Sequence, residues 1–211
     1  MFSDFEKKFL SNRSKKGIYT DLEKFLKNNY KKGHRLLDVG AGTGIYSKLA
    51  KKIGYEVYAI DYNPEICKFK EIKILFCDLN TQKLPFLDNY FDVVIMTEVI
   101  EHLYNTGFIL SEINRVLKEK GILYLTTPNL ANLKNKLWFL FFSYFITHKK
   151  NPGLGDHINH ITPLFLKYFL ERTNFQKIRI SYLNSFFPFT KIKLPNSEFF
   201  SDTVKLIAYK K

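Results

Sequence analysis

The sequence predicts an α/β fold in which short buried strands alternate with amphipathic helices. An apolar run at residues 36–39 is followed by glycines at 40, 42 and 44, which is typical of a strand that turns sharply into a helix. Residues 91–96 are almost entirely apolar, as expected for a strand of a parallel sheet that helices cover on both faces. These two observations predict a mostly parallel sheet with helices on either side.

Apolar periodicity and turn residues place the other elements. Strands are expected at residues 35–39, 56–61, 72–76, 91–96 and 122–126, and helices at 2–10, 20–29, 45–53 and 106–117. Thr20, with Glu23 three residues later, predicts a capping box at the start of the second helix. Thr162 and Pro163 predict the start of a later helix. The stretch 184–202 has no clear periodicity and is expected to be a loop or hairpin insertion.

Composition limits the class of protein. With 211 residues, 45% of them hydrophobic, we expect one domain with a full core. The net charge of +13 suits phosphate-bearing substrates, nucleic acid or an anionic membrane, and it equally suits a lysine-rich solvated surface. The first residues contain no apolar leader, and Cys67 and Cys77 show no metal or redox spacing. A cytoplasmic location is therefore expected.

The glycine loop predicts a site for a nucleotide-like molecule. Glycine permits positive φ and leaves room for a ligand, and the following helix presents unpaired N–H groups. Asp61 ends the second strand 21 positions after Gly40, which suits a carboxylate that binds ribose hydroxyls; a helix N-cap is the alternative. A dehydrogenase is disfavoured because Ile45 stands where a dinucleotide fingerprint needs its third glycine.

Two further strand ends carry polar side chains. Asp78, with the backbone N–H of Leu79, follows the third strand and suits the exocyclic amine of a base, although a turn aspartate is the alternative. After the fourth strand, Glu98 and His102 stand four residues apart. If a helix or turn begins there, both point into the crevice beyond the strand ends.

As a set, these motifs resemble those of class I S-adenosylmethionine-dependent methyltransferases. The resemblance rests on LLDVGAGTG, VYAIDYNPE, FCDLNTQKLPF, FDVVIMTEVIEHL and EINRVLKEKGILYLTTPN, which follow one another over residues 36–129. The most similar subgroup is that of small-molecule O-methyltransferases, including ubiquinone-type and polysaccharide-cluster enzymes. The family implies a Rossmann-like three-layer sandwich with a seven-stranded, mostly parallel sheet whose last strand is antiparallel. Residues 178–183 and 204–209 fit the final pair of strands.

The resemblance also implies S-adenosyl-L-methionine as the cofactor, with S-adenosyl-L-homocysteine as the product. For the methionine portion it implies Asp38, Gly40, Gly42 and Gly44, with the backbone from Gly40 through Ala41 to Gly44 against the cofactor. For the nucleoside it implies Asp61 on the ribose, Tyr62 packed on adenine, and Asp78 and Leu79 at the adenine edge. Thr97 and Glu98 are implied to line the sulfonium end.

One methyltransferase domain is expected over residues 1–211. Within it we expect an N-terminal helical cover at 1–33, a cofactor-binding half at 34–128, a hydrophobic lid and substrate region at 129–175, and closing strands with a loop insertion at 176–211.

The acceptor region begins with a nearly unbroken apolar segment at residues 137–146. This segment is too short to span a bilayer, and lysines flank it without any acid between 129 and 151. It is expected to lie in a membrane interface or to form a lid over a lipid-like acceptor. The alternative is a helix buried against the sheet or a partner chain.

Histidines on the loop before the Thr162 helix are candidates for catalysis. His160 is the candidate to orient or deprotonate an acceptor hydroxyl, with His102 and Glu98 as competitors; a structural or capping role is the alternative. No metal site is predicted, because further ligands at suitable spacing are missing around His157 and His160.

The sequence thus predicts methyl transfer to a small-molecule acceptor, at an oxygen of a sugar or lipid-linked intermediate, with peripheral membrane contact through 137–146. An RNA methyltransferase is the second hypothesis, and only the net charge supports it. The fourth strand is followed by Thr97-Glu98-Val99-Ile100 and lacks the Asn/Asp-Pro-Pro-aromatic clamp of amino methylation. A non-catalytic cofactor-binding subunit is the third hypothesis.

Overall fold

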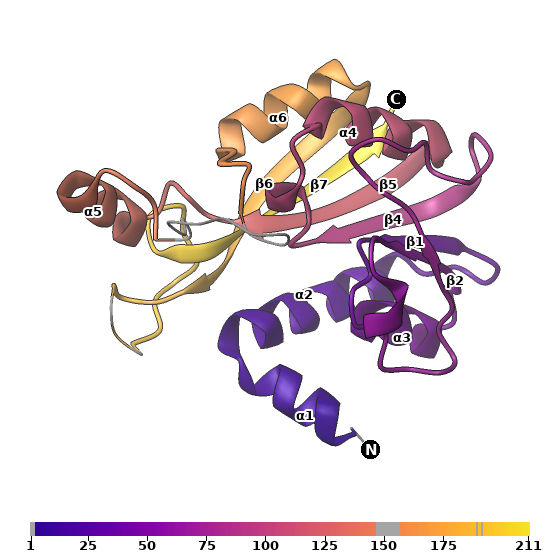
Figure 1. The fold of residues 1–211 in the computed structure, drawn as a ribbon, viewed down its shortest axis with the longest axis horizontal. Helices are drawn as coiled ribbons and strands as arrows, with labels where there is room; N and C mark the ends of the chain where they lie inside the picture. The colour runs from indigo at the N-terminus through magenta and orange to yellow at the C-terminus, as the bar shows by residue number, and fades with distance from the viewer. Residues whose placement is uncertain (1–2, 147–156, 189, 191) are drawn as a thin grey trace.

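The computed structural model describes residues 3–146, 157–188, 190 and 192–211 (Figure 1). Within these ranges one seven-stranded sheet has the order β3-β2-β1-β4-β5-β7-β6, in which β7 is antiparallel to both of its neighbours. The strands are β1 (Arg35–Val39), β2 (Glu56–Asp61), β3 (Ile74–Phe76), β4 (Phe91–Thr97), β5 (Leu117–Pro128), β6 (Phe175–Ser185) and β7 (Ser201–Lys210). The predicted fold, including the antiparallel strand, is confirmed.

Helices cover both faces of the sheet. Figure 1 shows α4 (Thr106–Val116) and α6 (Pro163–Arg172) on one face, and α1 (Asp4–Ser11), α2 (Arg13–Asn29) and α3 (Ile45–Ile53) on the other. Alternate residues of a strand point to opposite faces: Leu37 and Val94 pack in the core beneath α4, whereas Leu36 and Val93 pack in the core beneath α2. Burial on both faces explains why these strands are almost continuously apolar.

The start of the second helix was predicted wrongly. Helix α2 begins at Arg13, and Thr20 lies inside it, where its hydroxyl donates to the Lys16 carbonyl at 2.9 Å. Asn12 is the N-cap of α2, because its side chain accepts from the Lys15 N–H at 3.1 Å. The capping box belongs to α1, between Ser3 and Glu6.

Two other boundaries differ from the predictions. Strand β3 begins at Ile74 instead of residue 72. Helix α4 ends at Val116, because Leu117 already pairs with Phe91 as the first residue of β5. Asn174, which follows α6, has the left-handed conformation (φ +62°) that an asparagine tolerates.

Arg115 of α4 fixes the connector between β3 and β4, on which Leu84 and Phe86 lie. Its guanidinium donates to the carbonyls of Leu84 (2.9 Å) and Phe86 (2.8 Å) and to the Glu112 carboxylate (2.7 Å). Glu112 in turn accepts from the Leu84 N–H at 2.9 Å. The connector has no regular structure, so its N–H and carbonyl groups lack the partners that a sheet or helix would provide. Arg115 and Glu112 supply those hydrogen bonds instead.

Helix α5 (Leu133–Phe142) lies apart from the two helical layers, beside the ends of β6 and β7 (Figure 1). The Leu133 N–H donates to the Phe199 carbonyl at 2.7 Å, and the Asn129 amide donates to the carbonyls of Glu198 and Ser201. These bonds attach α5 to the loop before β7. Among the helices that the structure describes, α5 included, none is long and apolar enough to cross a membrane.

We predict that Arg115→Met lowers the free energy of unfolding by about 2–3 kcal/mol, because it leaves a buried carboxylate and two carbonyls without their charged donor. Urea denaturation measures the change. Lys167→Met is the control, since it removes only an exposed ion pair to Glu171 at 3.7 Å and should cost no more than about 0.5 kcal/mol. Equal losses for both variants would contradict the role given to Arg115.

Candidate functional site

The glycine loop connects β1 to α3. Gly40, Gly42 and Gly44 all have positive φ (+73°, +52° and +78°). The N–H groups of Gly40 and Ala41 donate to the Ile60 carbonyl at 2.9 and 3.0 Å, so the loop is anchored to the end of β2. A Cβ on Gly40 would collide with the Val99 side chain, whereas a Cβ on Gly42 would meet no atom within 4 Å. The loop is therefore packed on one side and open on the other.

Asp61 stabilises the open part of this loop. Its Oδ2 accepts from the Gly42 N–H at 2.7 Å, and its Oδ1 accepts from the Asn63 N–H at 2.8 Å. The second bond closes the turn before η1 (Pro64–Ile66). The N-cap alternative for Asp61 is wrong, because Asn63 is the N-cap of η1. The carboxylate thus lies against the glycine loop, where the sequence placed it.

Asp38 lies behind the loop and is fully buried. The Ser47 hydroxyl of α3 donates to its Oδ2 at 2.6 Å, while Oδ1 is buried without a hydrogen-bond partner in the part of the chain that the structure describes. Burial, with a smaller contribution from the Asp61 charge, raises the pKa of Asp38 to about 7. An orphaned buried carboxylate oxygen beside an open glycine loop fits a ligand that carries a hydrogen-bond donor or a cation.

Next to Asp61, two aromatic side chains are exposed. Tyr62 is 58% exposed and Phe76 56% exposed, and their ring centroids are 5.6 Å apart. Large aromatic side chains at the end of parallel strands offer a stacking surface for a planar base. This arrangement fits the predicted packing of Tyr62 on adenine.

Asp78 and Leu79 lie at the end of β3. The Asp78 carboxylate accepts from the Asn80 N–H at 3.0 Å and from the Thr81 hydroxyl at 2.8 Å, so both of its oxygens close a turn. Leu79 is buried. The turn alternative therefore describes the Asp78 side chain in this structure, and contact of Asp78 and Leu79 with adenine stays a prediction.

Thr97 is the last residue of β4, and Glu98 follows it directly. Thr97 is buried, and Glu98 has a left-handed backbone (φ +54°) that turns the chain out of the strand. Glu98 Oε1 is buried and makes no hydrogen bond within the described residues. Burial raises the pKa of Glu98 to about 7, so this carboxyl can take up or release a proton near neutral pH.

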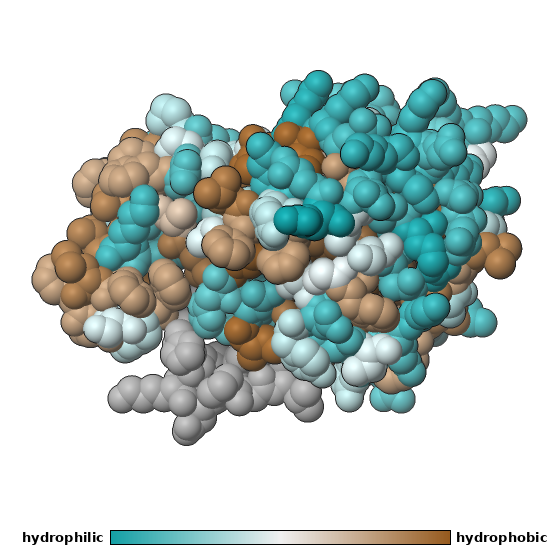
Figure 2. All heavy atoms as spheres, turned by 90° about the horizontal axis from the view of Figure 1, so that it is seen from above, coloured by the Kyte–Doolittle hydropathy of each residue, from teal (hydrophilic) through white to brown (hydrophobic). Residues whose placement is uncertain are grey.

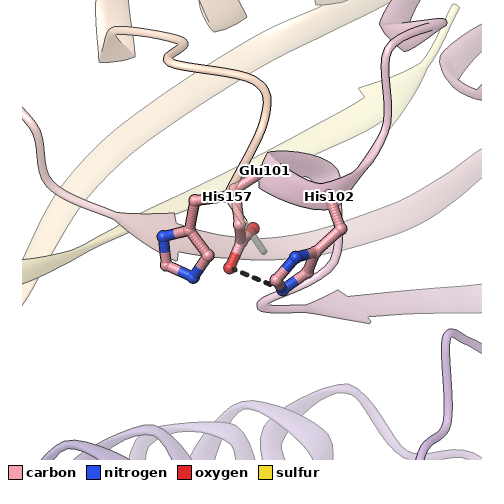
Figure 3. A group of neighbouring side chains, drawn as sticks. All are labelled: Glu101, His102 and His157. Atoms are coloured by element: carbon pink, nitrogen blue, oxygen red, sulfur yellow. Dashed lines mark ion pairs between the residues drawn. The ribbon is translucent and has the colours of Figure 1, made fainter. Parts of the chain in front are cut away.

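The turn after Glu98 is a 3-10 helix, η2 (Ile100–His102), so Glu98 and His102 do not lie on an α-helical face. The structure instead brings together Glu101, His102 and His157, as Figure 3 shows. Glu101 is 3% exposed, and its Oε2 accepts from the Thr127 hydroxyl at 3.1 Å. Burial and the nearby Glu98 charge raise the pKa of Glu101 well above its ordinary value. Glu101 was not among the sequence candidates.

The loop before α6 delivers His157 to this cluster. The N–H groups of Ile158 and Asn159 both donate to the Glu101 carbonyl, at 3.0 and 2.9 Å. The Asn159 amide also donates to the Thr106 hydroxyl at 2.6 Å. These bonds join residues more than fifty positions apart, which no local sequence pattern reveals.

His160 lies on the same loop, outside the three-residue cluster. Its ring stacks on Phe145 with centroids 5.6 Å apart. His160 also lines a cavity of about 560 Å³ together with Tyr104, Phe165 and Phe169. Glu98 and His102 thus lie around η2, whereas His160 lies between this cavity and a small pocket that Glu101 and His157 also line.

Comparison with known proteins identifies the family. A sequence profile described as a methyltransferase domain matches residues 9–180, most of the chain. The chain belongs to the class I S-adenosylmethionine-dependent methyltransferases. S-adenosyl-L-methionine is accordingly its cofactor, and Asp38, the glycine loop and the Tyr62–Phe76 pair fit a donor with a cationic amino acid end and a planar base.

Individual relatives agree with this assignment. The chain is 31% identical over 142 residues to a ubiquinone/menaquinone biosynthesis C-methyltransferase of Paraburkholderia xenovorans, covering 61% of this chain and 56% of that protein. It is 26% identical over 160 residues to a ubiquinone biosynthesis O-methyltransferase of Pelagibacter ubique, covering 72% and 66%. The chain thus spans little more than half of the first relative. A crystal structure of a SAM-dependent methyltransferase from Archaeoglobus fulgidus superposes with a TM-score of 0.71 at 24% identity, covering 98% of both chains.

We predict that Gly40→Ala destabilises the fold and weakens cofactor binding more than Gly42→Ala does. Both substitutions place a Cβ at positive φ, which costs about 1 kcal/mol. Only the Gly40 Cβ collides with Val99, so its cost includes displacement of the turn after β4. Thermal unfolding in the absence of cofactor isolates this difference, and equal melting temperatures for the two variants would contradict it.

Proposed function

We propose that this protein transfers a methyl group from S-adenosyl-L-methionine to an oxygen of a small-molecule, lipid-linked acceptor. The observation that carries the donor half of the proposal is the glycine loop, with Asp38 behind it and Asp61 bonded across it. When bound, the cofactor supplies an electrophilic methyl group on a sulfonium sulfur. The protein has to align an acceptor with that carbon and exclude water.

On the donor side, the roles follow from the contacts of the chain. Asp61 holds Gly42 in place and retains lone pairs for ribose hydroxyls, since an ionised carboxylate has about four acceptor sites. The unpartnered Oδ1 of Asp38 would accept from the cationic end of the methionine portion. Tyr62 and Phe76 offer the stacking surface for adenine.

On the acceptor side, the reaction needs a group that receives one proton. The acceptor oxygen forms the new C–O bond while the C–S electron pair returns to sulfur, so the products are a methyl ether, S-adenosylhomocysteine and a proton. Glu98 can accept that proton because its pKa lies near 7. His160, on the aromatic cavity, is the alternative acceptor of the proton.

We predict that Asp61→Ala weakens binding of S-adenosylhomocysteine about tenfold or more, because the change removes a carboxylate ligand and releases the Gly42 N–H. Isothermal titration calorimetry measures the dissociation constant. Glu56→Ala is the matched control, since Glu56 lies at the other end of the same strand and is exposed. Unchanged binding by Asp61→Ala would remove Asp61 from the cofactor site.

The case for a lipid-linked acceptor rests on the surface of α5. We call the exposed apolar side chains of this helix the α5 surface; they are Leu137, Phe139, Leu140, Phe141 and Phe142. Leu140 and Phe141 are 72% and 74% exposed, which is unusual for adjacent large apolar residues. Phe145, two residues beyond the helix cap, stacks on His160, so the apolar segment reaches one of the catalytic candidates.

Charge favours an anionic bilayer as the partner of the α5 surface. Lys134 and Lys136 lie on the same helix, and no acidic residue occurs between 129 and 151. Figure 2 shows that apolar atoms gather at the α5 end of the face in view, while the other end is largely hydrophilic. An apolar helix flanked by lysines gains both from insertion among acyl chains and from attraction to anionic headgroups.

We predict that the protein floats with vesicles of phosphatidylcholine and phosphatidylglycerol, and that the Leu140→Ser, Phe141→Ser double variant does not. Flotation should fall when phosphatidylglycerol is omitted, because the lysines then lose their counter-charge. Leu87→Ser is the matched control: Leu87 is 74% exposed but lies in the connector before β4, and its substitution should leave flotation unchanged.

Two results would overturn the membrane proposal. One is flotation that the double variant and the control retain equally. The other is absence of flotation together with a dimer that the double variant converts to a monomer, which would assign the α5 surface to contact with a second copy of the chain.

A further inference from the structure

We infer that Glu101, His102 and His157 form a binding site for a divalent transition-metal cation. Each residue offers one ligand atom, and these atoms all lie within 4.8 Å of one another. Figure 3 shows the Glu101 carboxylate between the two imidazole rings. The inference departs from the sequence-based expectation of no metal site. That expectation counted spacing along the chain, whereas His157 arrives from a distant loop.

The geometry is close to that of a coordinated cation. Bonds from a transition metal to imidazole nitrogen or carboxylate oxygen are about 2.0–2.2 Å long, so ligands on one ion lie up to about 4.4 Å apart. Glu101 Oε1 lies 3.9 Å from His102 Nε2, and the two imidazole centroids are 4.9 Å apart at an angle of 73°. Small side-chain rotations are therefore enough to close the set around one ion.

The state of Glu101 is the second, independent observation. Its Oε1 is buried and receives no hydrogen bond from the described residues, while Oε2 is bound by the Thr127 hydroxyl. Glu98, whose Oε1 is equally unpartnered, is close enough to disfavour a second negative charge. Buried carboxylates carry a high free-energy cost unless a cation or donors compensate for them. A bound cation at Glu101 would supply that compensation.

The surroundings hold the ligands as a metal site requires. The loop that carries His157 is fixed to η2 by two hydrogen bonds to the Glu101 carbonyl and to α4 by the Asn159–Thr106 bond. Thr127 orients the carboxylate, as outer-shell donors do in metalloproteins. Two imidazoles and one carboxylate favour Mn²⁺, Fe²⁺, Co²⁺ or Zn²⁺ over Mg²⁺ or Ca²⁺, which prefer oxygen ligands only.

Three protein ligands leave coordination positions open to water or to an acceptor oxygen. A hydroxyl bound there would lose its proton more readily, as metal-bound water does. This second role rests on the methyl transfer proposed above, whereas cation binding does not depend on it.

The test uses the full chain without any affinity tag, stripped with a chelator and free of cofactor and acceptor. Mn²⁺ binding is followed by electron paramagnetic resonance, and Co²⁺ binding by its visible absorption. We expect one ion per chain, weakened about tenfold or more by His157→Gln and by Glu101→Gln, and a rise in melting temperature with Co²⁺ that both variants lose.

His34→Gln is the matched control, because His34 forms a second imidazole–carboxylate pair of the same 3.9 Å separation, to Asp92, whose charge Lys118 already compensates. This variant should bind Mn²⁺ and Co²⁺ like the unmodified chain. His157→Gln alters a half-exposed loop residue, so it keeps the test informative if Glu101→Gln fails to fold. If the chain binds neither Mn²⁺ nor Co²⁺, or if His157→Gln leaves their binding unchanged, Glu101 and His102 form only an imidazole–carboxylate pair. Either result would overturn the inference.

Failure of the metal test leaves the proposed function untouched, since cofactor binding is measured separately on Asp61→Ala. Conversely, a chain that binds Co²⁺ through His157 but fails to bind S-adenosylhomocysteine would support the metal site and contradict the methyl transfer.

Discussion

The parallel pairing of β1 with both β2 and β4 is the constraint on which the site depends. Val39 pairs with Ile60, and Asp38 with Ile95, so all three strands end at one edge of the sheet. Because each functional segment follows directly after one of these strands, the register alone brings the glycine loop, Asp61 and Glu98 to a common edge. The helices on both faces fix this register by burying alternate side chains of every central strand.

Burial of acidic side chains is the main electrostatic feature of that edge. Asp38 and Glu101 are buried and Glu98 is half-buried, and each has one buried oxygen without a hydrogen bond among the described residues. Burial of an oxygen without a donor costs free energy, and the hydroxyl donors to Asp38 and Glu101 each reach only the other oxygen. The two proposals above assign a ligand to each of these oxygens: the methyl donor to Asp38, a cation to Glu101 and the reacting acceptor to Glu98.

The sequence predicted those features that depend on residues close together in the chain. The glycine loop, Asp61 at a strand end and the Thr162 cap of α6 are local patterns, and the structure contains each of them. The family resemblance added the antiparallel β7, which periodicity alone does not indicate. The start of α2 was missed because Gly17, normally a helix breaker, lies within the helix, and because Asn12 supplies the cap.

The cluster of Glu101, His102 and His157 was not predictable from the sequence for a different reason. It requires the loop before α6 to dock on η2, and the bonds of Asn159 that achieve this cross more than fifty residues. Asp78 shows the opposite case. Its position at a strand end suited a ligand contact. Its short side chain instead accepts hydrogen bonds from the Asn80 N–H and the Thr81 hydroxyl in the adjacent turn, as aspartate often does.

The contact of Gly40 with Val99 has a mechanical consequence. Because no space remains for even one methyl group between the glycine loop and the segment after β4, neither can shift without displacing the other. Val99 directly follows Glu98 and is the N-cap of η2, so the backbone that receives the donor and the backbone that carries the acidic and imidazole side chains form one rigid unit. Adaptation to different acceptors then falls to segments outside this unit, of which α5 is the most exposed.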